Sequence, residues 1–103
     1  MIIYNVTIKV NWAIAEDWLQ WMQQTHIPDV LNTGCFEKHQ LIRLLETDET
    51  EGPTYAVQYY TSALSRYDNY LQNFAPKLRE ETVNKWGDKF IAFRSLMQVV
   101  EPL

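Results

Sequence analysis

The sequence predicts an α+β domain whose strands and helices follow the order β-α-β-β-α-β. Residues 2–12 alternate apolar and polar side chains, which is the period of two expected of a strand with one buried face. Apolar residues then recur at helical spacing in two segments, residues 14–25 and 64–78. Three more apolar segments have the length of strands and are bounded by turn residues: 35–46, 54–60 and 90–100.

The first helix is predicted from its apolar face, which turns polar residues outward. That face consists of Ile14, Trp18, Trp21, Met22 and Thr25. Pro28 should end or kink the helix, because proline lacks an N–H and disfavours a helical residue before it. Val30 and Leu31 could add one more turn before Gly34, which we expect to be the C-terminal cap.

The second half of the chain is predicted to hold a hairpin, a second helical region and a last strand. An acidic turn over residues 47–53 joins the second strand to the third. Thr61 or Ser62 is expected to cap the second helical region, and Pro76 should kink it or divide it into two consecutive helices. Residues 87–88 end this region, the last strand follows, and residues 101–103 form a short tail.

This order predicts a ferredoxin-like fold in one domain spanning residues 1–103. Because crossovers between parallel neighbours are right-handed, both helices should lie on one face of a four-stranded antiparallel sheet. The third and fourth strands are apolar on both sides, so the second face would expose a patch larger than monomers usually show. A symmetric homodimer that packs sheet against sheet would bury that face, and we expect one.

Charge and composition exclude several classes of partner. The net charge is −4, and the nine basic residues are scattered, which argues against nucleic-acid binding. No segment approaches the ~20 consecutive apolar residues that a membrane-spanning helix needs. The N-terminus lacks the basic and apolar regions of a signal peptide, and Cys35 is alone, so we expect a cytoplasmic protein.

Several motifs resemble a known superfamily. The opening MIIYNVT and the segments WLQWM, HIPDVL and TGCF are similar to a family of short bacterial proteins known only as a domain of unknown function. More broadly, the chain resembles the dimeric α/β-barrel superfamily, within which that family falls and which includes antibiotic-biosynthesis monooxygenases, haem-degrading monooxygenases and stress-responsive barrel proteins. The resemblance implies that two ferredoxin-like sheets close into a shared barrel, often around a ligand cavity. It implies no particular activity.

The resemblance to the superfamily's enzymes is uneven. Haem-degrading members carry an iron-ligating histidine on the second helix, and residues 63–86 contain no histidine, which argues against haem degradation. Cofactor-free, quinone-forming monooxygenases have no rigid motif to compare, so that activity stays an alternative. Two histidines and one cysteine do not show the ligand spacing of a zinc site, and we expect neither a metal nor a cofactor.

His26 is the first candidate for chemistry. A neutral imidazole at a cavity edge could hydrogen-bond a ligand or act as a general base, although histidines near helix ends more often cap carbonyl groups. Trp18, Trp21 and Met22 could line an apolar cavity beside it, although core packing explains the same spacing. Asp29 could orient His26, but we favour a solvent-exposed carboxylate.

Two functions follow as expectations. The first, which we favour, is a small dimeric domain that is non-catalytic or binds a ligand in an apolar, aromatic-lined cavity near His26. The alternative is a cofactor-independent monooxygenase or isomerase that acts on a small aromatic substrate, with His26 as the proton acceptor.

Overall fold

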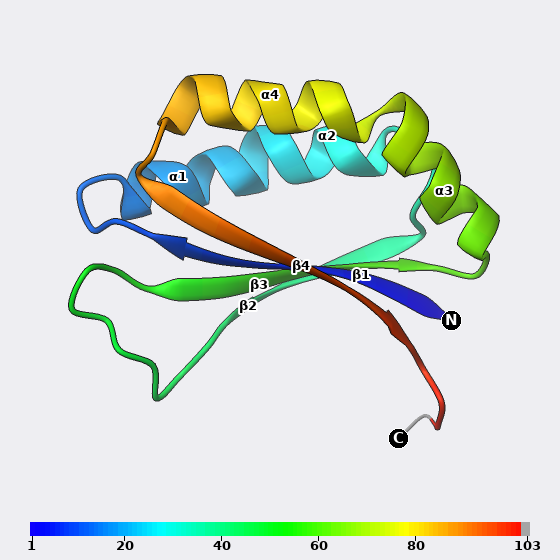
Figure 1. Ribbon diagram of the computed structural model, residues 1–103, viewed down its shortest axis with the longest axis horizontal. Helices are drawn as coiled ribbons and strands as arrows, with labels where there is room; N and C mark the ends of the chain where they lie inside the picture. Colours follow the sequence, from blue (N-terminus) through cyan, green and yellow to red (C-terminus); the bar gives the residue numbers. More distant parts are fainter. Residues whose placement is uncertain (102–103) are drawn as a thin grey trace.

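The computed structural model describes residues 1–101 and has two layers, a sheet and a set of helices above it (Figure 1). Of the predicted tail, residues 102 and 103 lie outside the described part. The elements in chain order are β1 (Ile2–Val10), α1 (Ala15–Trp21), the π-helical turn η1 (Met22–His26), α2 (Ile27–Leu31), β2 (Lys38–Arg43), β3 (Thr54–Thr61), α3 (Leu64–Asn73), α4 (Ala75–Trp86) and β4 (Phe90–Gln98).

The sheet has the strand order β2-β3-β1-β4, and every neighbouring pair is antiparallel. Val6 on β1 lies opposite Val57 on β3 and Arg94 on β4. Because side chains alternate along a strand, these three point to the same face. The order, the pairing and the helices on one face confirm the predicted ferredoxin-like fold.

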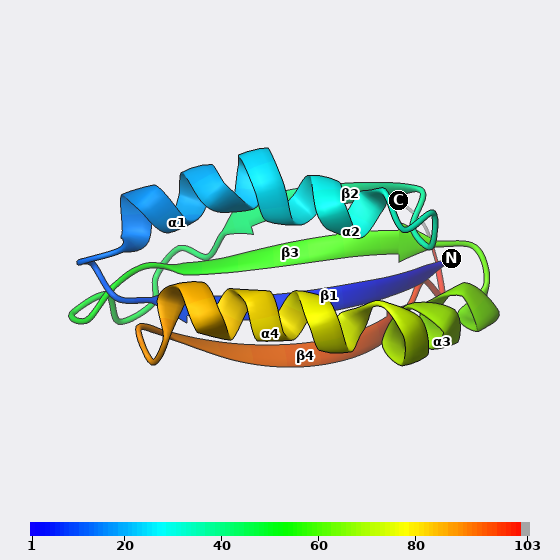
Figure 2. The same ribbon diagram turned by 90° about the horizontal axis from the view of Figure 1, so that it is seen from above.

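All the helices cover one face of the sheet and leave the other open (Figures 1 and 2). The continuous segment α1–η1–α2 runs over β2 and β3, and α4 runs antiparallel to it over β1 and β4 (Figure 2). The core lies between helices and sheet, where Val10, Trp18, Val30 and Val57 are fully buried. No helix within residues 1–101 has both the length and the apolar character that crossing a membrane requires.

The first helix does not end at Pro28, nor does the chain leave helical geometry there. Trp21 and Ile27, the residues on either side of η1, both have right-handed helical dihedral angles, and the Ile27 N–H donates to the Met22 carbonyl, five residues back. Pro28 follows this wide turn as one of the first residues of α2. Proline is tolerated in the first turn of an α-helix, where the N–H that it lacks would have no partner within that helix.

Two other boundaries differ from the prediction. β2 is shorter than residues 35–46, because Cys35 and Phe36 are buried in the core before the strand begins. Thr61 belongs to β3, and the residue that precedes α3 is Ala63. Pro76 lies in the first turn of α4, so the predicted division into two consecutive helices is confirmed.

Candidate functional site

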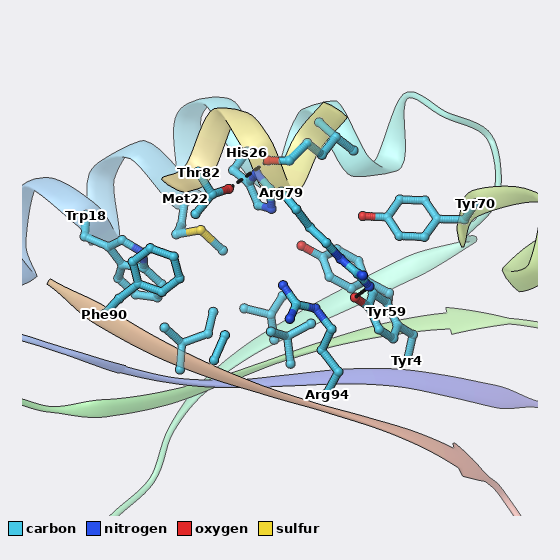
Figure 3. A pocket seen from close by; sticks show the side chains of 15 residues that line it. Tyr4, Trp18, Met22, His26, Tyr59, Tyr70, Arg79, Thr82, Phe90 and Arg94 are labelled. Carbon is cyan, nitrogen blue, oxygen red and sulfur yellow. Dashed lines mark hydrogen bonds between the residues drawn. The ribbon is translucent and has the colours of Figure 1, made fainter. Parts of the chain in front are cut away.

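A cavity lies between the helices and the covered face of the sheet (Figure 3). We call it the central cavity. The volume open to the centre of a water-sized sphere is about 40 Å³, which is room for a few water molecules. Its lining comes from both layers: Tyr4, Val6, Ile8, Trp18, Met22, His26, Val57, Tyr59, Tyr70, Leu78, Arg79, Thr82, Phe90, Ala92 and Arg94.

His26 lines the central cavity from the end of η1. Its ring stacks on Trp21 with the ring centroids 5.0 Å apart, and it is partly buried. Burial lowers the pKa of His26 to about 4; the carboxylate of Asp29 opposes this shift, and the guanidinium of Arg94 adds to it. The imidazole is therefore neutral at physiological pH and can accept a hydrogen bond or a proton.

The structure brings together three of the four residues expected beside a ligand. Trp18, Met22 and His26 all line the central cavity. Trp18 is fully buried and packs on Tyr55, with the ring centroids 5.4 Å apart. Trp21 does not line the cavity; it contacts His26 and the edge of Trp86 instead. Trp21 thus supports the imidazole from behind.

Three tyrosines from different elements form one end of the cavity. Tyr4 on β1 contacts Tyr59 on β3 and Tyr70 on α3, with ring centroids 6.0 and 5.7 Å apart. Burial raises the pKa of the Tyr59 and Tyr70 hydroxyls, which are therefore protonated at neutral pH. The buried Tyr59 hydroxyl meets no hydrogen-bond partner within residues 1–101. These phenols are donors that face a small polar space in an otherwise apolar pocket.

Two arginines enter the cavity from opposite layers (Figure 3). Arg79 descends from α4 and donates to the Tyr4 hydroxyl at 3.1 Å. Arg94 rises from β4, on the face where Val6 and Val57 also lie. No Asp or Glu of residues 1–101 lines the cavity, and neither arginine has a carboxylate within salt-bridge distance in that range.

Sequence analysis did not identify these arginines as site residues. A signal existed for Arg94, since in the last strand it shares the parity of Phe90, Ala92 and Leu96 and interrupts an apolar face. Arg79 lies three residues before Thr82 and beside Leu78, a spacing that only becomes meaningful once α4 is placed over the sheet. Within the described chain, no three side chains of metal-ligating type gather at one point.

Solved structures share this fold at low sequence identity. A dimeric ferredoxin-like protein from an uncultured marine organism superposes with a TM-score of 0.76 at 11% identity, over 99% of this chain and 97% of its own. SnoaB, a cofactor-independent oxygenase from Streptomyces nogalater, has a TM-score of 0.70 at 11% identity, over 99% and 96%. A Deinococcus radiodurans protein described provisionally as an antibiotic biosynthesis monooxygenase has a TM-score of 0.60 at 10% identity, over 100% and 96%.

Sequence comparison identifies the family of the chain. A family model described as "Domain of unknown function (DUF4286)" matches residues 1–100. Among curated protein sequences, none matches this chain. The resemblance stated from the motifs is therefore confirmed for the family, and the structures confirm it for the fold.

Proposed function

The chain belongs to the DUF4286 family of unknown function, and we propose from its own residues that it is a homodimer that binds a small apolar or aromatic ligand in the central cavity. The observation that carries this proposal is the cavity itself, in which Trp18, Met22 and Phe90 provide apolar walls beside the polar His26. Ligand sites combine such walls with few polar groups. The free, buried Cys35 suits the reducing cytoplasm, which we propose as its location.

The open face of the sheet supports the homodimer. Ile91, Phe93 and Met97 on β4 leave 58%, 67% and 36% of their surface exposed there. On β3, in the same face, the Tyr60 hydroxyl donates to the Gln58 side-chain oxygen at 3.1 Å, so polar groups accompany the apolar row. A second copy of the chain would bury the row and offer matching polar groups by symmetry. A structural neighbour is itself described as a dimeric ferredoxin-like protein.

Native mass spectrometry of freshly purified protein tests both parts of the proposal. We expect a species of twice the 12.2 kDa chain mass, with additional mass from a retained small molecule that organic extraction releases. A monomer at micromolar concentration would overturn the dimer. A dimer that neither retains a molecule nor takes one up from a library of small aromatic compounds would overturn the ligand-binding function.

A second candidate function is cofactor-independent oxygenation or isomerisation, and the neutral His26 facing the cavity favours it. In the oxygenase case, a hydroxyarene such as 1-naphthol would take up one O₂ and yield 1,4-naphthoquinone and water. His26 would accept the phenolic proton, although a base with a pKa of about 4 is weak. Oxygen consumption that His26→Gln abolishes would support this reading, and an unchanged rate would remove His26 from it.

A further inference from the structure

The central cavity carries positive charge inside an acidic protein. The chain has a net charge of −4, yet the only full charges that line the cavity in residues 1–101 are those of Arg79 and Arg94. Elsewhere in that range the arginines Arg43 and Arg66 pair with glutamates. An uncompensated guanidinium in a partly desolvated site is costly, and a bound anion would offset that cost.

The surroundings of Arg79 show that its donors are incompletely used. One terminal amino group donates to the Tyr4 hydroxyl, but the buried Nε–H meets no acceptor within residues 1–101. The Tyr59 hydroxyl, on a residue only 2% exposed, also lacks a partner there. Buried polar groups in folded proteins nearly always have partners. Both groups can donate, so an acceptor-only ligand would satisfy both.

Arg94 completes the arrangement from the opposite layer. Its side chain points from β4 toward the helices and toward the space between His26 and Tyr59 (Figure 3). Unlike Arg79 it is exposed at the cavity's edge. A guanidinium presents a planar pair of N–H donors that matches the two oxygens of a carboxylate. One arginine is therefore held inside the cavity and the other can close over a ligand.

We propose that the ligand of the central cavity is an anion, the carboxylate of a small organic acid held between Arg79 and Arg94, with its apolar part against Trp18, Met22 and Phe90. This inference rests on the ligand-binding function proposed above and specifies its substrate class. A cavity of about 40 Å³ favours compact acids. A ring such as that of benzoate would be accommodated by movement of the flexible Met22 side chain, with Arg94 left to contact the carboxylate.

The test compares an acid with its neutral isostere. Benzoate and benzamide are titrated separately into ¹⁵N-labelled protein in low-chloride buffer, and amide shifts are followed for residues around the cavity. We expect benzoate to bind about tenfold more tightly than benzamide, because only the acid forms charge-assisted hydrogen bonds with the arginines. Raising the salt concentration should weaken benzoate binding and leave benzamide binding unchanged.

Variants assign the effect to the two arginines. Arg94→Gln should raise the benzoate dissociation constant about tenfold without changing that of benzamide. Arg79→Gln should likewise weaken benzoate binding and leave benzamide binding unchanged. Should Arg79→Gln fail to fold, Arg79→Lys replaces it, because lysine keeps the positive charge but loses the planar pair of N–H donors and should also weaken benzoate binding. Arg66→Gln is the matched control, because Arg66 is exposed and faces Glu37 at 4.0 Å, away from the cavity lining.

The outcomes separate this inference from the proposed function. If benzoate and benzamide bind with equal affinity, the proposal of an anionic ligand would be overturned and a site for a neutral ligand would remain. The same conclusion would follow if Arg94→Gln and Arg66→Gln changed benzoate binding to the same extent. Failure of both compounds to shift any cavity resonance at millimolar concentration would overturn the anion and the proposed cavity function together.

Discussion

His26 makes the stability of the protein depend on pH. Its pKa in the folded state, about 4, lies below the value of about 6.5 for an unfolded histidine. The unfolded chain therefore binds a proton at a higher pH than the folded chain does. The contribution of His26 to stability is complete above pH 6.5 and is lost as the pH falls from 6.5 toward 4.

We predict that the free energy of unfolding falls by roughly 2 kcal/mol between pH 7.5 and pH 5 because His26 must be protonated in the unfolded state. Urea denaturation at half-unit pH steps measures this slope. His26→Gln should flatten it. His39 is exposed on β2 and makes His39→Gln the matched control. A wild-type slope that survives in His26→Gln would show that another group is responsible. The carboxyl groups of Glu37 and Asp48, whose pKa values are lowered, titrate below this window.

At the same scale, the sequence predicted the apolar part of the site better than its polar part. Trp18, Met22 and His26 could be predicted from the sequence because they lie four residues apart on one continuous helical segment, where spacing alone shows which side chains share a face. Arg79 and Arg94 belong to elements that meet only in the folded chain, and the pairing of Val6 with Arg94 depends on strand register. Arg94 does interrupt an apolar strand face in the sequence, but whether a charge lacks a counter-charge depends on the folded structure, so that pattern alone could not assign either arginine to the site.

The elements themselves followed from periodicity, and their boundaries depended on tertiary contacts. The strand at residues 2–12 and the break near Pro76 were predictable from alternation and from proline chemistry. The continuation past Pro28 was not, because a π-helical turn has no sequence signature strong enough to predict. Phe36 was assigned to a strand because it is hydrophobic, but it precedes β2 and stacks on Tyr4, with the ring centroids 5.9 Å apart.

The loop before β3 is tied to the end of β1 by close backbone approach. The Val10 N–H donates to the Pro53 carbonyl at 3.1 Å, and the Trp12 N–H donates to the Glu51 carbonyl at 3.0 Å. Gly52 lies between these two bonds, and a Cβ there would overlap the Val10 carbonyl. Only glycine allows this approach.

We predict that Gly52→Ala destabilises the protein by about 3 kcal/mol or more, because backbone atoms at the end of β1 must move to admit the methyl group. Gly34→Ala is the matched control. Gly34 has a φ of +77° but open space around it, so its substitution should cost only the backbone strain of about 1–2 kcal/mol. Urea denaturation measures both variants. A smaller loss for Gly52→Ala than for Gly34→Ala would contradict the role of close packing at this loop.

At the scale of the whole molecule, the two faces of the sheet differ in character. The covered face carries the central cavity, and the open face carries the apolar row of Ile91, Phe93 and Met97. Alternation along β4 sends Arg94 to one face and Phe93 to the other. A substitution on the open face should therefore alter assembly without entering the cavity, so the proposed dimer and the proposed ligand site can be tested independently.

We predict that Phe93→Lys converts the proposed dimer to a monomer, because a symmetric interface would contain two unpaired lysines in place of two large apolar side chains. The dissociation constant should rise about 100-fold or more. Val83→Lys is the matched control, since Val83 is a similarly exposed apolar residue on α4, in the helical layer. Sedimentation velocity across a concentration series measures both variants.

If Phe93→Lys dimerises like the wild type, or if only Val83→Lys dissociates, the interface would lie on the helical side and not on the open sheet face. Benzoate binding retained by a folded Phe93→Lys monomer would show that one chain holds the complete site.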